Sequence, residues 1–221
     1  MDIFKYGQIE LNHLKKKDKK LGVAIERIGM IERKVTPDLF AALVNSIVGQ
    51  QISMKAADTV WNRMKERIGE ITPQSIVAAT AGEIQKCGLS MRKAGYIKGI
   101  GDAVAQGELD IAEFPELPDS DIIKRLSSLN GIGVWTAEML MIFSMERPDV
   151  LSWGDLAIRR GMTNLYSLKK LDKAKFERYR KRYSPYGSVA SLYLWELSSD
   201  SSAGHLVNLS ETLCDEGEIS E

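Results

Sequence analysis

The chain has 221 residues, of which 44% are hydrophobic, and it carries 30 basic and 30 acidic side chains. This length is enough to bury a core in one or two small domains. No apolar run approaches the roughly 20 residues that span a bilayer. The start of the chain, Met1 to Lys5, lacks the basic-then-apolar order of a secretory signal. We therefore expect a cytoplasmic protein that makes no contact with a membrane.

Cysteine and histidine are too scarce for the usual metal chemistry. The two cysteines, Cys87 and Cys214, cannot form a four-cysteine iron–sulfur site, and no zinc-ligand spacing is present. His13 and His205 are the only histidines. We predict no metal and no cofactor, and we expect Cys87 to be a small buried apolar residue.

The net charge of zero hides an uneven distribution of charge. Residues 200 to 221 hold six acidic residues and no lysine or arginine, so the rest of the chain has 30 basic against 24 acidic residues. A body of about +6 is enough for a modest surface that faces phosphates. The acidic tail, which contains serine and glycine, is expected to be poorly ordered.

Two helices with a short turn between them are predicted early in the chain. Apolar residues at helical spacing favour an amphipathic helix over residues 37 to 48, with Thr36-Pro37 supplying the N-cap and a proline in the first turn. Gly49 ends this helix, and Ser53 begins another that runs through Arg67. The turn between the two helices therefore holds Gln50 and Gln51.

The rest of the chain also reads as helices with clear start and stop signals. No convincing alternating strand and no internal repeat are present, so the predicted fold class is all-α. The predicted starts and stops, in chain order, are Thr72-Pro73, the capping box Thr80-x-x-Glu83, Ser90 through about Gln106 with Gly107, Pro118 to Asp121, Val134, Asp155, Asp172 through Tyr183, and Ser184-Pro185 before the final helix.

A Gly-Ile-Gly turn runs directly into the helix predicted from Val134. Glycines at 131 and 133 allow positive φ and leave no Cβ in the way of a partner. The free N–H groups and the positive dipole end of the helix face such a turn, which can therefore hold a phosphate without any basic side chain. A turn of this kind also occurs as a plain connection between helices, so the motif is weak when it stands alone.

Asp155 is an isolated carboxylate in Trp153-Gly154-Asp155, at the start of another predicted helix. A buried carboxylate can stabilise positive charge that develops on a sugar and can orient or deprotonate water. The same residue is also a good helix N-cap, because Leu-Ala-Ile-Arg-Arg follows it. The two roles can coexist.

Three spaced motifs together resemble a known family. Leu129-x-Gly131-Ile132-Gly133-x-x-Thr136-Ala137 and the downstream Gly154-Asp155 are similar to the helix-hairpin-helix and the aspartate loop of the HhH-GPD DNA glycosylase superfamily. Residues 47 to 53, Ile-Val-Gly-Gln-Gln-Ile-Ser, resemble the [IL]-x-x-Q-Q-x-S segment of its alkylpurine branch, the 3-methyladenine DNA glycosylase II type. The end helix, from Tyr186-Gly187-Ser188 to Trp195, fits as well, so the resemblance covers roughly residues 20 to 200.

The resemblance implies a two-lobed helical fold without the N-terminal β domain of larger relatives. Residues 37–145 would form a central bundle that ends in the helix-hairpin-helix. Residues 146–199 would form the catalytic loop and C-terminal lobe, against which the N-terminal helices of residues 1–36 pack. Residues 200–221 would be the acidic tail.

The resemblance also implies roles for individual residues. Asp155 would be catalytic. Relatives that also cut the DNA strand carry a lysine where this chain has Trp135, so water and not an amine would attack the sugar. Trp135 and Trp195 match aromatic residues of the pocket for the flipped base, where an electron-rich ring attracts a cationic purine. Met139 and Trp153 are further candidate walls; core packing is the alternative for Trp195 and the favoured interpretation for Trp153 and Met139.

The expected contacts with DNA come from two segments. The hairpin would contribute Gly131, Ile132, Gly133 and Thr136. The glutamine turn would contribute Gln50, Gln51 and Ser53 and would enter the minor groove, with Gln51 filling the gap left by the flipped base. Glutamines in such a turn also commonly satisfy loop carbonyls, and this alternative stays open.

The leading hypothesis is a monofunctional DNA glycosylase that removes alkylated purines such as 3-methyladenine or 7-methylguanine and so starts base excision repair. Its partner would be double-stranded DNA with a damaged base, and we expect a monomer. Two alternatives remain at this point. One is a non-catalytic helix-hairpin-helix protein that binds duplex DNA, and the other is a glycosylase for another damaged base.

Overall fold

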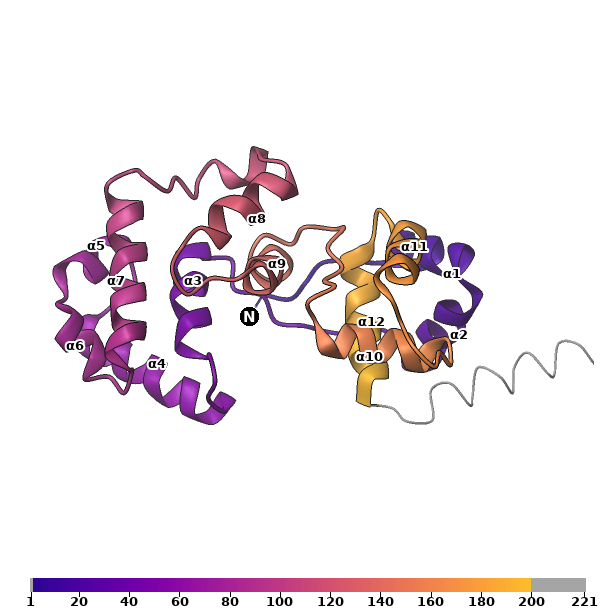
Figure 1. Ribbon diagram of the computed structural model, residues 1–221, viewed down its shortest axis with the longest axis horizontal. Helices are drawn as coiled ribbons and strands as arrows, with labels where there is room; N and C mark the ends of the chain where they lie inside the picture. Colours follow the sequence, from indigo (N-terminus) through magenta and orange to yellow (C-terminus); the bar gives the residue numbers. More distant parts are fainter. Residues whose placement is uncertain (1, 200–221) are drawn as a thin grey trace, which may run out of the picture. The chain divides into compact units, whose positions relative to one another are not determined.

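The computed structural model describes residues 2–199 (Figure 1). Within that range the regular structure is helical, with twelve α-helices and one short 3-10 helix, and Ile3 and Lys34 form an isolated β-bridge. The predicted all-α fold is therefore confirmed for this part of the chain. The acidic tail from Asp200 onward, which includes His205 and Cys214, lies outside the described residues.

The chain divides into two compact units. We call the first the hairpin unit; it spans Val35–Met145. Its helices are α3 (Leu39–Val48), α4 (Met54–Ile68), α5 (Pro73–Ala78), α6 (Ala81–Gln85), α7 (Met91–Ala105), the 3-10 helix η1 (Phe114–Glu116), α8 (Asp119–Ser127) and α9 (Val134–Phe143).

We call the second the aspartate unit. It combines Ile3–Lys34 with the chain from Glu146 onward, so both ends of the described chain contribute to one core. Its helices are α1 (Gln8–Lys17), α2 (Lys19–Ile28), α10 (Leu156–Leu165), α11 (Lys173–Tyr183) and α12 (Gly187–Ser199).

Helix α7 is central to the hairpin unit, where it packs against α3, α5 and α6. Gly101 permits the close approach of α5, because a Cβ at this position would lie 2.5 Å from Cγ2 of Ile76. Ile97 on α7 is fully buried, and so is Ile47 on α3. Cys87 is also buried, as expected, and burial raises the pKa of its thiol.

Most helices begin where their capping residues predict, but α3 does not. It begins at Leu39, and its N-cap is Asp38, whose Oδ1 accepts a hydrogen bond from the N–H of Ala41 at 3.0 Å. The predicted start at Pro37 with Thr36 as the cap is therefore wrong. The backbone N–H of Thr36 donates to the carbonyl of Phe143 at 2.8 Å, which ties this residue to the end of α9 instead.

Helices α10 and α12 cross closely in the aspartate unit. A Cβ at Gly161 of α10 would lie 1.9 Å from the carbonyl oxygen of Leu194 in α12, so only glycine allows this approach. The sequence of α12 is apolar on most sides, and its residues from Gly187 to Leu194 are all buried. The crossing holds α10 against the core of its unit.

A buried carboxylate joins the two ends of the chain within the aspartate unit. Asp18, the N-cap of α2, accepts hydrogen bonds from the Tyr166 hydroxyl at 2.5 Å and from Nη1 of Arg182 at 2.6 Å. Burial, the Tyr183 hydroxyl and the Asp18 carboxylate together raise the pKa of Tyr166 far above its ordinary value. This network was not visible in the sequence.

No helix within residues 2–199 is both long enough and apolar enough to cross a membrane.

Candidate functional site

The Gly-Ile-Gly turn packs against Tyr96 of α7. Gly131 has φ +89, and a Cβ there would lie 2.5 Å from Cδ2 of Tyr96, so both its conformation and its surroundings require glycine. Ile132 is buried, and its N–H donates to the carbonyl of Leu129 at 3.1 Å. The side chain of Ile132 therefore anchors the turn, and only its backbone remains for a partner.

Helix α9 starts at this turn with no side-chain cap. Its N-cap residue is Gly133, which has an extended backbone (φ −93, ψ 170) and open space where a Cβ would lie. A capping side chain normally accepts hydrogen bonds from the backbone amides of the first turn. Because no side chain does so here, these amides and the positive end of the helix dipole are available to an anion. The exposed side chain of Val134 follows directly. This arrangement can bind a phosphate oxygen.

The glutamine turn is joined to the hairpin by a hydrogen bond. Nε2 of Gln50 donates to the carbonyl of Gly131 at 2.8 Å, so the interpretation that a glutamine satisfies a loop carbonyl holds for this residue. Gln51 is exposed and has φ +59, a conformation that non-glycine residues seldom adopt. The hydroxyl of Ser53 accepts from the N–H of Ala56 at 3.3 Å and so caps α4.

Lys93 supports the same turn, a role that the sequence analysis did not predict. Its Nζ donates to the carbonyls of Val48 at 3.0 Å and Gln50 at 2.6 Å, at the end of α3. Burial, assisted by the charge of Arg92, lowers its pKa. Lys93 and Tyr96 lie three residues apart on α7, which makes them neighbours on one helix face. Helix α7 thus supports the glutamine turn and the hairpin together.

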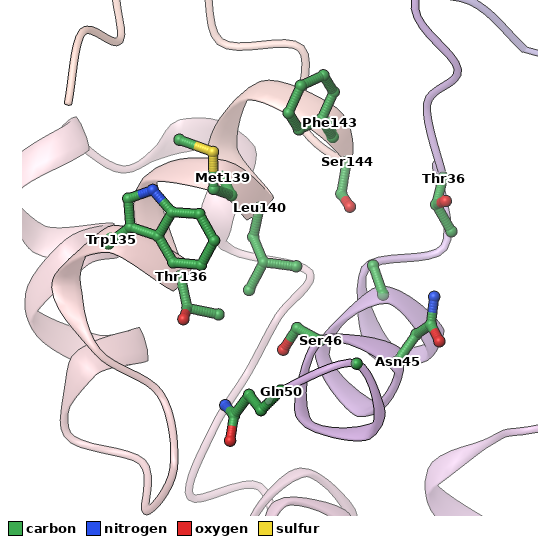
Figure 2. Close-up of a pocket in the computed structure, with 12 residues that line it drawn as sticks. Thr36, Asn45, Ser46, Gln50, Trp135, Thr136, Met139, Leu140, Phe143 and Ser144 are labelled. Atoms are coloured by element: carbon green, nitrogen blue, oxygen red, sulfur yellow. The ribbon is translucent and has the colours of Figure 1, made fainter. Parts of the chain in front are cut away.

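A pocket of about 320 Å³ lies in the hairpin unit. Figure 2 shows side chains of α3 on one side of it and side chains of α9 on the other. Trp135, which is 49% exposed, and Met139 are among its walls, as are Gln50 and Thr136. The remaining lining residues are Thr36, Ala42, Asn45, Ser46, Gly49, Leu140, Phe143 and Ser144.

The other two predicted pocket tryptophans belong to the aspartate unit and do not line this pocket. Trp153 is half-buried and meets the ring of Phe176 edge-on, with the centroids 5.2 Å apart. The guanidinium carbon of Arg159 lies 4.8 Å from the centroid of the Trp153 ring. Trp195 is half-buried on α12.

Asp155 is buried, with 7% of its surface exposed, and it is the N-cap of α10. Its Oδ1 accepts a hydrogen bond from the N–H of Ile158 at 2.9 Å. The capping role considered for this residue is therefore real. The cap also fixes the direction of the carboxylate, which is what electrostatic catalysis requires of a charged group.

The loop that leads to Asp155 is held by the first turns of α12. The carboxylate of Asp149 accepts hydrogen bonds from the Ser184 hydroxyl at 2.5 Å and from the N–H of Gly187 at 3.0 Å. The Ser188 hydroxyl accepts from the N–H of Val150 at 3.0 Å, and the Ser191 hydroxyl donates to the carbonyl of Val150, also at 3.0 Å. Sequence reasoning noted the Tyr-Gly-Ser start of this helix but missed its function as an anchor for the loop.

No group of three or more histidine, cysteine, aspartate or glutamate side chains that could hold a metal occurs within residues 2–199.

Comparisons with known proteins agree with the motifs. The HhH-GPD superfamily base excision DNA repair protein family matches residues 44–185. DNA-3-methyladenine glycosylase 1 of Schizosaccharomyces pombe is 34% identical over 164 residues, which cover 72% of each chain. The DNA-3-methyladenine glycosylase of Saccharomyces cerevisiae is 30% identical over 199 residues, covering 73% of this chain and 67% of the yeast protein.

Solved structures are similar over most of the chain. The DNA-3-methyladenine glycosidase of Bacillus halodurans superposes with a TM-score of 0.82 at 34% identity, covering 97% of this chain and all (100%) of the other. The S. pombe 3-methyladenine DNA glycosylase, solved in complex with abasic DNA, gives a TM-score of 0.73 at 30% identity over 86% of this chain and 96% of that one. The chain therefore belongs to the HhH-GPD superfamily of base excision DNA repair proteins, and the relatives named here fall in the 3-methyladenine glycosylase branch that its motifs predicted.

Proposed function

We propose that this protein is a monofunctional DNA glycosylase that hydrolyses the N-glycosidic bond of alkylated purines, such as 3-methyladenine or 7-methylguanine, and leaves an abasic site. The observation that carries this proposal is Asp155, a buried carboxylate whose direction is fixed by its own helix. The relatives named as 3-methyladenine glycosylases support the choice of substrate class.

The hairpin binds duplex DNA through its phosphates, so this contact does not depend on the base sequence of the DNA. A phosphate oxygen fits the uncapped start of α9 beside Gly133, where backbone amides and the helix dipole attract it. We assign to the exposed Gln51 the role of filling the base stack after the target nucleotide has turned out. Its backbone has a left-handed conformation, which is strained for a residue other than glycine and persists only when the surrounding structure holds it in place.

Trp135 and Met139 provide apolar and aromatic walls for the extruded base. A purine that carries a positive charge after alkylation is attracted to the electron-rich face of the indole ring. Such a base is also a good leaving group, because it departs as a neutral molecule. One carboxylate is then sufficient for catalysis, without a second group to protonate the base.

In the chemical step, the bond between C1′ and the purine nitrogen breaks and its electron pair leaves with the base. Positive charge develops at C1′ and the ring oxygen of the sugar, and the carboxylate of Asp155 stabilises it. Water then adds to C1′ and loses a proton, for which Asp155 is the candidate acceptor. The products are the free base and an abasic site.

Trp135 supports a monofunctional reaction. It occupies the position at which strand-cutting members of the superfamily carry a lysine that forms a Schiff base with the sugar. With an indole at this position, water is the proposed nucleophile and the sugar–phosphate backbone stays intact.

The test is to incubate the protein with methylated duplex DNA, chromatograph the released bases and examine the DNA for breaks before and after alkali. We expect free 3-methyladenine or 7-methylguanine, with strand breaks only after alkali. Breaks without alkali would overturn the monofunctional part. Duplex binding without any released base from methylated, deaminated or oxidised DNA would favour the non-catalytic binding protein.

A further inference from the structure

Arg159 stands one helical turn after Asp155 on α10, and its charge has no carboxylate partner within residues 2–199. Its Nε is the one buried side-chain nitrogen or oxygen in this part of the chain that lacks a hydrogen-bond partner. Leaving a buried donor unsatisfied costs stability, so such a group in a folded protein calls for an explanation. A guanidinium in this state is suited to an anionic ligand.

The guanidinium lies over an aromatic ring. Its central carbon lies 4.8 Å from the centroid of the Trp153 ring, and Trp153 in turn meets Phe176 of α11 edge-on at 5.2 Å. A contact between the guanidinium carbon and an aromatic ring uses none of the N–H groups as hydrogen-bond donors. Within residues 2–199, Nε is the one guanidinium nitrogen of Arg159 that is both buried and without a hydrogen-bond partner. Trp153 therefore orients a cation whose donors are still available.

The spacing on α10 brings this cation close to the candidate catalytic group. Asp155 is the N-cap of α10, and the backbone N–H of Arg159 donates to its carbonyl at 3.1 Å, so the two residues stand one helical turn apart at the start of this helix. A carboxylate near DNA repels the backbone phosphates, and a neighbouring arginine that pairs with one of them offsets this repulsion.

We propose that Arg159, held on the ring of Trp153, binds a backbone phosphate of the DNA next to the target nucleotide. The ligand class is a phosphodiester, which matches the planar, two-pronged donor geometry of a guanidinium. The position next to the target nucleotide rests on the proposed function of Asp155; the binding of a phosphate does not. Arg159 is thus a second phosphate contact, made by a side chain, in addition to the backbone contact at the hairpin.

The first experiment measures affinity for duplex DNA at several salt concentrations for wild type, Arg159→Gln and Arg160→Gln. Arg160 is the matched control, because it is the adjacent, exposed arginine of the same helix. We expect Arg159→Gln to weaken binding about tenfold and to reduce the slope of log K against log salt by about 0.9, the contribution of one phosphate contact. Equal effects of the two substitutions, or no effect of Arg159→Gln, would overturn the proposal.

Arg159→Lys tests whether the loss of affinity comes from the lost charge or from misfolding of the variant. Lysine keeps the charge but loses the planar edge, so we expect an intermediate affinity with a salt slope close to that of wild type. Thermal unfolding of all the variants separates loss of binding from loss of structure. A salt slope for Arg159→Lys as low as that for Arg159→Gln would argue against a charge contact with phosphate.

The second experiment locates the phosphate. Duplexes with a single stable abasic-site analogue are made with one neutral methylphosphonate at each position around the site in turn. We expect wild type to lose affinity at one flanking phosphate where Arg159→Gln loses nothing further, which is the signature of a direct pair. If the proposed function is wrong, no single methylphosphonate position around the abasic-site analogue will lower the affinity of either protein more than the others. The salt slopes of the first experiment still test whether Arg159 binds a phosphate.

Discussion

Helices α9 and α10 begin in opposite ways. Gly133 leaves the start of α9 without a side-chain cap, whereas the carboxylate of Asp155 occupies the start of α10 and accepts a hydrogen bond from Ile158. The first arrangement leaves backbone donors for an anion that comes from outside. The second uses the backbone donor to hold an anion that belongs to the protein. In the proposed function, the same helix-end electrostatics binds the DNA backbone in one unit and orients the candidate catalytic group in the other.

Removing the charge of Asp155 while keeping its cap gives the largest expected effect. Asparagine caps helices about as well as aspartate, so Asp155→Asn should change stability by less than about 0.5 kcal/mol. Its rate of base release should fall on the order of 10²–10³-fold, as it does when one preorganised electrostatic contact is lost elsewhere. Single-turnover rates at saturating DNA measure this effect.

Asp172→Asn is the matched control for that change. Asp172 also caps a helix of the aspartate unit, with Oδ1 accepting from the N–H of Lys175 at 2.8 Å, but it is exposed. This variant should release bases at the wild-type rate. A rate for Asp155→Asn equal to that of the control would remove Asp155 from the mechanism.

Filling the start of α9 tests the other half of the comparison. Gly133→Asp should be tolerated, because the backbone is extended there and a Cβ meets nothing within 4 Å. The new carboxylate would occupy the phosphate position, so DNA affinity should fall by about 2–3 kcal/mol, or about 30–160-fold. Gly133→Ser, a neutral cap, should lose only a few-fold, and fluorescence anisotropy with a labelled duplex distinguishes the two. Unchanged binding by Gly133→Asp would mean that no phosphate lies at this helix end.

Trp135, on the first turn of α9, separates attraction for charge from simple packing. Trp135→Leu keeps an apolar wall in the pocket but removes the indole face. Loss of a desolvated cation–π contact is worth about 2 kcal/mol, so release of cationic 7-methylguanine should slow about 30-fold. Release of neutral hypoxanthine, if the wild-type protein performs it, should slow less. An equal loss for both bases would assign Trp135 to shape alone.

Lys93 carries the smallest of these effects. Lys93→Met removes two hydrogen bonds to the end of α3 and so loosens the glutamine turn, which contains Gln51. We expect DNA affinity to fall about fivefold, or about 1 kcal/mol, with the single-turnover rate at saturating DNA nearly unchanged. Arg92→Met removes a neighbouring charge that is exposed and should leave affinity within about twofold. If the two variants behave alike, the loss reflects charge and not the position of the turn.

The features that could be predicted from sequence are those that depend on local geometry. Glycine at 131 and 133, Asp155 before a helix, the helix start at Thr72 and the capping box at Thr80 act within a few residues, so their pattern is readable in one segment. The start of α3 was misplaced because Thr36 and Asp38 are both good caps, and a contact with Phe143 decides between them.

The supporting residues could not be found in this way, because their partners lie far along the chain. Lys93 is one of 30 basic residues, and nothing near it in sequence indicates that it meets the carbonyl of Gln50, 43 residues away. Likewise, Asp149 accepts a hydrogen bond from the N–H of Gly187, and Ser188 accepts one from the N–H of Val150, both between segments 38 residues apart. Of the tryptophans predicted for the base pocket, Trp135 lines the pocket of the hairpin unit, whereas Trp153 finds its neighbours in Phe176 and Arg159.

The buried carboxylate of Asp18 has a consequence for how the protein is made. Its hydroxyl partner, Tyr166, leaves the ribosome 148 residues later, and its cation, Arg182, 164 residues later. At about 5–20 residues per second, the Asp18 carboxylate stays without these two partners for on the order of ten seconds. The contacts of the hairpin unit are complete well before that time. During synthesis, the hairpin unit therefore completes its contacts first, and the aspartate unit completes its core only after α11 has been made.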